Sequence, residues 1–197
     1  MLYRTMPRSP EPLSILGFGC MRFPEKNGKI DEEAAERQIR RAIERGINYF
    51  DTAAVYHMGA SEPFLGRVLK KDGLRDKVFL ATKLPHWNAQ SRADMDRLLD
   101  MQLQKLQTNR IDYYLVHNLT APTWQRMHEL GILDFLESAK RDGRIRYAGF
   151  SYHGDRDTFP RIVDAWNWDF CQIQYNFLDE QTQAGRAGLE YAARKNL

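Results

Sequence analysis

Four polar side chains of this sequence have the chemical types needed for acid catalysis at an oxygen atom. Each lies at or shortly after the end of an apolar run: Asp51, Tyr56, Lys83 and His117. An ammonium next to a phenol favours the phenolate and lowers the phenol pKa from its ordinary value of about 10, and a carboxylate can pair with that ammonium. Such a phenol can protonate a carbonyl oxygen, while an imidazole donates a hydrogen bond to the same oxygen. None of these groups carries a hydride, so reduction of a carbonyl implies a nicotinamide cofactor.

The chain around these residues alternates between strand and helix patterns. In the first unit, apolar residues recur at helical spacing between Asp31, a suitable N-cap, and Gly46, a suitable C-terminal residue. Strands that alternate with helices indicate parallel pairing with right-handed crossovers. Because parallel strands end at one edge of the sheet, the four side chains should meet there. Six units are predicted, with strands at 15–19, 47–50, 78–82, 111–116, 145–150 and 170–174, and helices at 31–46, 61–71, 92–106, 132–141, 157–166 and 182–195.

Two α/β architectures fit this pattern, the open doubly wound sheet and the closed (β/α)8 TIM barrel. The dinucleotide-binding sequence Gly-x-Gly-x-x-Gly does not follow the first predicted strand, which speaks against the open sheet. In a TIM barrel the functional residues come from the carboxyl ends of several strands, as the polar residues do here. We therefore predict one TIM-barrel domain over residues 1–197.

The composition argues against several other classes of protein. A chain of 197 residues, 43% of them hydrophobic, suits one globular domain. The net charge is only +3, and no stretch is both basic and aromatic, so no nucleic-acid partner is expected. No signal peptide or membrane-spanning run is recognisable, which predicts a cytoplasmic protein without a membrane partner. Cys20 and Cys171 are too far apart for a metal-binding motif, and no metal is expected.

Several segments, in this order along the chain, resemble the aldo-keto reductases: Phe50-Asp51-Thr52-Ala53 with Tyr56, Gly59-Ala60-Ser61-Glu62, Ala81-Thr82-Lys83, Asp112-Tyr113-Tyr114-Leu115-Val116-His117, Gly149-Phe150-Ser151 and Gln172-Ile173-Gln174-Tyr175-Asn176. The resemblance implies an eight-stranded barrel that uses NADP(H) without a Rossmann domain. It also implies that Asp51, Tyr56, Lys83 and His117 are a catalytic tetrad that reduces an aldehyde or a ketone to an alcohol, with the tyrosine as general acid.

The same resemblance assigns residues to the cofactor. Ser151 and Gln172 would hold the nicotinamide carboxamide. The family usually has Asn after this serine, whereas here Tyr152 follows, so Asn118 or His153 could make the second contact. The loop that borders the cofactor after the first strand matches Gly19, Cys20, Met21 and Arg22. This loop and the sequence after Ser151 resemble a bacterial or archaeal branch whose members can carry an iron–sulfur-binding tail, and the 197 residues contain no such cysteine-rich segment.

The substrate is expected to be a small molecule with a carbonyl group. Trp87 and Trp124 follow the third and fourth predicted strands, where they could line a pocket for an apolar substrate. A complete barrel takes about 250 residues, so we expect strands seven and eight to be absent from this chain, which would be part of a longer enzyme or be completed by a partner. Neither the substrate nor the oligomeric state follows from the sequence.

Two other functions compete with carbonyl reduction. A metal-dependent hydrolase on the same barrel could use Asp51, His117 and His153, but the usual His-x-His pair is missing and Lys83 and Tyr56 would have no role. The other alternative is a non-catalytic subunit that binds the cofactor, or a truncated and inactive fragment of such an enzyme. The complete set of four catalytic residue types argues against a non-catalytic subunit.

Overall fold

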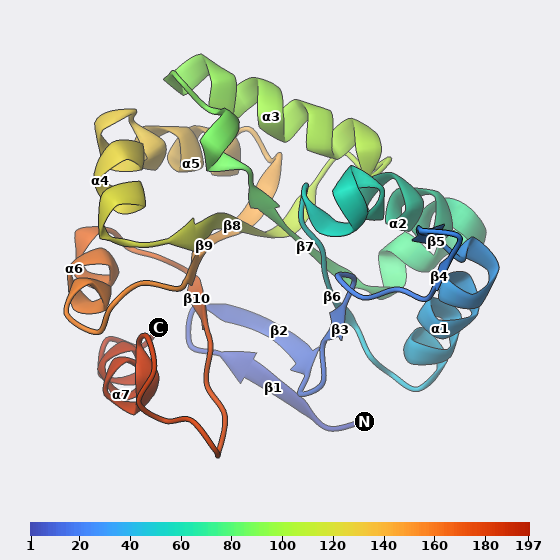
Figure 1. The fold of residues 1–197 in the computed structure, drawn as a ribbon, viewed down its shortest axis with the longest axis horizontal. Coiled ribbons are helices and arrows are strands. Elements are labelled where there is room, and N and C mark those ends of the chain that lie inside the picture. The colour runs from blue at the N-terminus through green and yellow to red at the C-terminus, as the bar shows by residue number, and fades with distance from the viewer.

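Six parallel strands form a strongly curled sheet in the computed structural model, which describes all residues 1–197. The sheet makes an arc that does not close into a ring (Figure 1). Its strand order is β10-β9-β8-β7-β6-β3, so neighbours in the sheet follow one another along the chain. This arrangement confirms the predicted α/β barrel architecture, as an incomplete barrel. The strands are β3 (Phe18–Gly19), β6 (Tyr49–Asp51), β7 (Phe79–Leu84), β8 (Ile111–Leu119), β9 (Ile145–Tyr152) and β10 (Phe170–Ile173).

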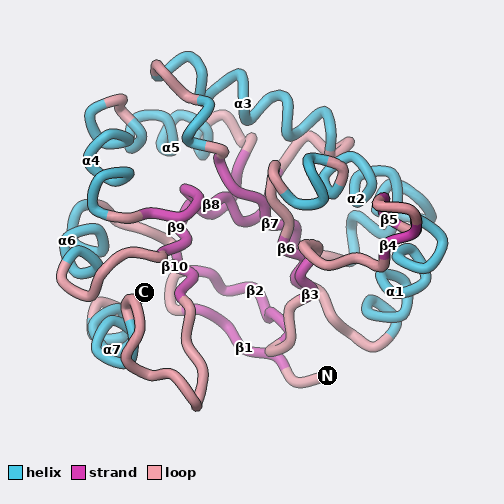
Figure 2. Tube along the Cα trace, in the orientation of Figure 1, coloured by secondary structure: helices cyan, strands magenta, loops and turns pink.

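The helices cover the convex face of the arc, as Figure 2 shows in cyan. The first begins as predicted, because the Asp31 carboxylate accepts a hydrogen bond from the Ala34 backbone N–H, and Gly46 after it has a positive φ of 86°. No helix combines the length and the hydropathy that a membrane span requires. The helices are α1 (Glu32–Glu44), α2 (Ser61–Lys70), α3 (Arg92–Lys105), α4 (Ala121–Glu129), α5 (Ile132–Arg141), α6 (Thr158–Ala165) and α7 (Gly185–Arg194), with short 3-10 turns at Tyr56–Gly59, Lys71–Lys77 and His86–Asn88.

Two hairpins and one helix were not predicted. The antiparallel pair β1 (Tyr3–Met6) and β2 (Ser9–Ser14) packs against the inside of the arc, where Ser9 Oγ lies 2.5 Å from Tyr113 Oη on β8. The pair β4 (Glu25–Lys26) and β5 (Lys29–Ile30) turns at an Asn-Gly sequence with positive φ at both residues. Helix α4 starts at a Thr120 capping box, and the strand predicted at 15–19 is reduced to the two residues of β3.

Apolar side chains are buried in two separate layers. The larger cluster, of 37 residues, fills the space between the sheet and the helices. The smaller cluster lies on the concave face and contains Ala81, Tyr113, Leu115 and Phe170. Both faces of the central strands are therefore buried, which explains why β8 reads as a continuous apolar run from Ile111 to Val116.

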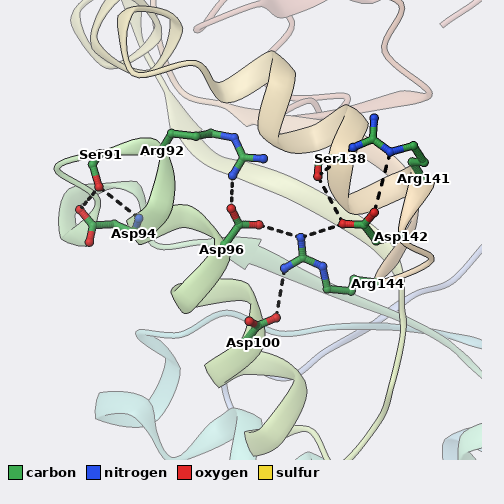
Figure 3. A network of polar contacts seen from close by, with 9 residues as sticks. All are labelled: Ser91, Arg92, Asp94, Asp96, Asp100, Ser138, Arg141, Asp142 and Arg144. Atoms are coloured by element: carbon green, nitrogen blue, oxygen red, sulfur yellow. Dashed lines mark hydrogen bonds and ion pairs between the residues drawn. The ribbon is translucent and has the colours of Figure 1, made fainter.

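The Arg144 side chain joins the start of β9 to helix α3 (Figure 3). One of its terminal nitrogens lies 2.7 Å from Asp96 and the other 3.1 Å from Asp100, and Asp142 is 3.4 Å away. Asp96 also pairs with Arg92 on its own helix. Because only 20% of the Arg144 side chain is exposed, this network is more shielded from solvent than an ordinary surface ion pair.

Candidate active site

The Lys83 ammonium is the centre of a hydrogen-bonded group at the carboxyl ends of β6 and β7. It donates to Asp51 Oδ1 at 2.6 Å, to the Thr52 carbonyl oxygen at 2.9 Å and to Tyr56 Oη at 3.1 Å. All three donors of the ammonium are therefore used, although the side chain is only 2% exposed. The predicted meeting of the carboxylate, the ammonium and the phenol is what the structure shows.

The alternation of side chains along the strands explains why these groups meet. The concave-face cluster contains Ala81 on β7 and Phe170 on β10. Lys83 and Gln172 lie two positions further along these strands and therefore point to the same face. Asp51 is aligned with Ala81 in the register of β6 and β7. Asp51, Lys83 and Gln172 therefore project from the concave face of the sheet, at the rim where the strands end.

Asp51 is a half-buried carboxylate with one oxygen that has no hydrogen-bond partner. Its Oδ1 accepts from Lys83, whereas Oδ2 is buried without any partner. Burial raises the pKa of Asp51 above its ordinary value, and the neighbouring Lys83 charge opposes that rise.

Tyr56 follows β6 in a tight 3-10 turn. Its backbone N–H donates to the Ala53 carbonyl, and the next two residues, His57 and Met58, have left-handed φ values of 51° and 53°. The Lys83 ammonium also lies 4.9 Å from the centre of the Tyr56 ring, within the range of a cation–π contact. The turn therefore directs the phenol back towards Lys83.

His117 reaches the same site from β8. Its ring stands edge-on to the Tyr56 ring, with 6.5 Å between the ring centres. The pairing of β8 with β9 shifts register between Val116 and Leu119, and Asn118 has a φ of 51° within this bulge. Burial, with a smaller contribution from the Lys83 charge, lowers the pKa of His117 from 6.5 to about 3, and Nδ1 is buried without a partner. The imidazole is therefore neutral at ordinary pH.

The predicted cofactor residues on β8, β9 and β10 lie beside one another. Ser151 Oγ accepts a hydrogen bond of 2.7 Å from the Asn118 backbone N–H. Gln172 is aligned with Ser151 in the register of β10 and β9, and its side chain is exposed. A hollow of about 420 Å³ between β3 and β10 is lined by Gly19, Asp51 and Gln172 among others. The structure thus brings these predicted residues to the rim that holds the Lys83 group.

The loop after β3 is divided between buried and exposed residues. Cys20 is fully buried, and its backbone N–H donates to the Asp51 carbonyl at 2.8 Å. Burial raises the pKa of the Cys20 thiol well above its ordinary value, so this cysteine is an uncharged core residue. Met21 and Arg22 are exposed.

The two tryptophans predicted to line the pocket lie in different places, and only one of them is beside the site. The Trp87 ring lies 5.3 Å from the His117 ring and is 40% exposed, which places it beside the site. Trp124 lies on α4, where its ring packs against Trp168 and His128 and makes no ring contact with His117. Only Trp87 is therefore brought together with the four predicted catalytic residues.

The residues of the predicted metal alternative do not form a metal-binding group. His153 is exposed, and its Nδ1 lies 3.2 Å from Gln183 Oε1. The structure contains no group of three or more His, Cys, Asp and Glu side chains arranged to hold a metal ion.

Comparison with known proteins places this chain and its architecture in one family. The model of the aldo/keto reductase family matches residues 15–197. The chain belongs to the aldo/keto reductase family. It is 27% identical to aldo-keto reductase yakc [NADP(+)] of Schizosaccharomyces pombe over 195 residues, and 30% identical to protein tas of Escherichia coli over 229 aligned positions.

Solved structures of the family have the same fold as this chain. The holo form of aldo-keto reductase AKR11C1 from Bacillus halodurans is 28% identical, covers all of this chain and gives a TM-score of 0.83. An aldo/keto reductase from Klebsiella pneumoniae, solved with NADP and acetate, covers 72% of the chain with a TM-score of 0.61 and 28% identity.

This aldo/keto reductase chain covers only part of the length of these relatives. It spans 56% of the yeast protein, 64% of protein tas, 64% of the Bacillus structure and 47% of the Klebsiella structure.

A second polar network lies behind Lys83, on the convex face of the sheet, and was not predicted as part of the site. The fully buried carboxylate of Glu62, on α2, accepts hydrogen bonds from Thr82 Oγ1 at 2.7 Å and from Gln102 Nε2 at 2.6 Å. Gln102 Nε2 also donates to the Lys83 carbonyl oxygen at 3.0 Å, so helices α2 and α3 fix the backbone that carries the ammonium. The sequence contained one signal for this network, the Ser61-Glu62 pair in the family-like segments.

Proposed function

We propose that the protein is an NADP(H)-dependent reductase that converts an aldehyde or a ketone into an alcohol, with Tyr56 as the general acid. The observation that carries the proposal is the position of Lys83, whose ammonium bonds to both Asp51 and the Tyr56 hydroxyl, with the His117 ring across the phenol. An ammonium, a phenol and an imidazole around one point are the groups that a carbonyl oxygen needs as it gains negative charge.

The direction of the Lys83 hydrogen bond keeps the proton of the phenol available. An ammonium only donates, so Tyr56 Oη accepts from it through a lone pair. The hydroxyl hydrogen of Tyr56 is then free to point to a carbonyl oxygen. When that proton leaves, the phenolate stays next to the ammonium, which stabilises its charge.

The low pKa of His117 supports Tyr56, rather than His117, as the acid. With a pKa of about 3, His117 is almost entirely neutral at neutral pH. A neutral imidazole can still donate one N–H hydrogen bond, so His117 orients the carbonyl oxygen and Tyr56 supplies the proton.

The residues at the rim fit the amide group of a nicotinamide. Ser151 Oγ accepts from the Asn118 backbone, which leaves the serine hydroxyl hydrogen free to donate, and the Gln172 side chain beside it is exposed. NADP appears in the name of the yeast relative and in the Klebsiella structure, which supports the choice of cofactor. When bound there, the reduced cofactor would be the source of the hydride for the carbonyl carbon.

The test is a Tyr56→Phe substitution in the complete enzyme. Because general acid catalysis contributes a factor of about 10² to 10⁴, carbonyl-dependent oxidation of NADPH should fall by that factor, while NADPH binding measured by fluorescence titration stays within twofold. Tyr191→Phe, on α7, removes an exposed hydroxyl that bonds to Asp164 and should leave turnover unchanged. Full turnover by Tyr56→Phe would refute the proposal.

A further inference from the structure

The turn directly after Tyr56 is strained. His57 and Met58 are consecutive residues in the left-handed region, with φ, ψ values of 51°, 44° and 53°, 34°. Side chains with a Cβ atom disfavour this conformation, so it persists only where neighbouring contacts hold it. The Met58 side chain is 93% exposed and provides no such contact. The backbone contributes one hydrogen bond of 3.0 Å, from the Ala60 N–H to the His57 carbonyl, and the side-chain contacts that hold the turn come from His57.

The His57 side chain is buried and both of its nitrogens are used. It is only 6% exposed. Nε2 accepts a hydrogen bond of 3.0 Å from the Phe23 backbone N–H, and Nδ1 lies 3.0 Å from Glu25 Oε1. A backbone N–H can only donate, so Nε2 carries no hydrogen and Nδ1–H is the donor to Glu25. The ring also stacks on the Phe23 ring at 5.6 Å.

These contacts connect the turn to a separate part of the chain. Phe23 and Glu25 lie in the segment that leads from Gly19–Arg22 into β4, and the Phe23 ring contacts Phe64 on α2 at 5.1 Å. The contacts of the His57 side chain with this segment therefore hold the backbone of His57, the residue that directly follows Tyr56.

We infer that His57 is a positioning residue, which holds Tyr56 Oη within hydrogen-bond distance of Lys83 and links the phenol to the loop that borders the proposed cofactor site. Its effect on turnover rests on the proposed function, whereas its effect on the position of Tyr56 does not. Without the imidazole, the turn can relax towards ordinary φ values, and the 3.1 Å contact between Tyr56 Oη and Lys83 Nζ is lost.

The test compares three variants of the complete enzyme. His57→Ala removes both hydrogen bonds. His57→Gln retains one acceptor and one donor on a side chain of similar length. Glu25→Ala removes only the acceptor of the Nδ1–H hydrogen bond. The Glu25 side chain is 54% exposed, so this substitution leaves the packing of the core intact. His128→Ala, at an exposed histidine on α4, is the control.

We expect His57→Ala to lower kcat by about 100-fold with KM within threefold, because a displacement of about 1 Å is enough for such a loss. His57→Gln should recover most of the kcat, and Glu25→Ala should lose about two- to fivefold. A crystal structure of His57→Ala should show Tyr56 Oη out of hydrogen-bond range of Lys83.

Three results would overturn the inference: a folded His57→Ala enzyme with Tyr56 still bonded to Lys83, a kcat loss that glutamine does not restore, or a Glu25→Ala enzyme with unchanged kcat. The proposed function fails separately. If Tyr56→Phe keeps full turnover while His57→Ala still displaces the phenol, the reductase proposal is wrong and the positioning role of His57 stands.

Discussion

Replacing Lys83 by methionine should destabilise the fold, because it leaves a carboxylate buried without its partner. Methionine has nearly the same length, so little cavity forms, but three hydrogen bonds, of 2.6, 2.9 and 3.1 Å, are lost together. At about 1 kcal/mol of net stabilisation each, the free energy of unfolding should fall by about 3 kcal/mol. This value is at the lower end of the cost of breaking a buried ion pair, as the Asp51 side chain is still 15% exposed.

The assay is urea unfolding of Lys83→Met, of Asp51→Asn and of the double variant. Asparagine removes the unpaired charge, so the double variant should be more stable than the sum of the single effects predicts, by at least about 1 kcal/mol. Lys83 opposes the burial that raises the pKa of Asp51, so its removal raises that pKa further. The folded state then binds more protons than the unfolded state above pH 3.8, and Lys83→Met should be less destabilised at pH 5 than at pH 7. Strict additivity, or a loss below about 1 kcal/mol, would refute this reasoning.

Three further predictions concern other parts of the molecule. The pKa of His117 is lowered to about 3 in the folded state, so the unfolded state binds more protons between pH 6.5 and 3. The free energy of unfolding should therefore fall by up to about 1.4 kcal/mol per pH unit as the pH is lowered through this window. In urea titrations, His117→Gln should show a shallower fall. Gly149→Ala should lower the free energy of unfolding by about 1 to 3 kcal/mol, because a Cβ there would lie 2.5 Å from the Phe170 carbonyl oxygen. A Cβ at Gly19 would meet nothing within 4 Å, so Gly19→Ala should lower it by less than about 1 kcal/mol. Equal midpoints of the two variants in thermal unfolding would contradict this. Arg144→Met should lower the free energy of unfolding by about 1 to 3 kcal/mol, because its contacts with Asp96 and Asp100 are lost. The control is Arg37→Met on the exposed face of α1, for which the change should be near zero. An equal effect of the two substitutions would contradict the prediction.

Most of the fold and the central group of the site could be predicted because both depend on local periodicity. Apolar runs and helical stripes define parallel strand–helix units, and parallel strands bring Asp51 and Lys83 to the same edge. The side chains of these two residues then share a face by the two-residue period of strands. The other residues of the rim, such as Ser151 and Gln172, were predicted from the resemblance to a family and not from periodicity.

Features that depend on contacts between distant segments were not predictable in the same way. The bulge at Asn118 depends on the pairing of β8 with β9, which no local pattern around His117 reveals. The turn at Tyr56–Gly59 ends on a glycine with positive φ, but the two left-handed residues before it, His57 and Met58, have no local signal. Side-chain contacts of His57 with a segment 34 residues earlier hold their conformation. The first hairpin was missed since two prolines interrupt the alternating pattern of β2.

Helix α4 shows how an unrecognised element changes the interpretation of a residue. Without it, Trp124 was expected in a loop at the rim. The helix instead turns the Trp124 ring towards Trp168, in the layer between the helices and the sheet.

The most direct test of the central claim, that Tyr56 donates the proton to the carbonyl oxygen beside Lys83 and His117, is a single-turnover measurement. The complete enzyme loaded with NADPH is mixed rapidly with an aldehyde, and the loss of reduced-nicotinamide absorbance is followed for wild type and Tyr56→Phe. The account predicts a step slower by about 10² to 10⁴ in the variant, with unchanged cofactor affinity. An unchanged rate of this step in Tyr56→Phe would contradict it.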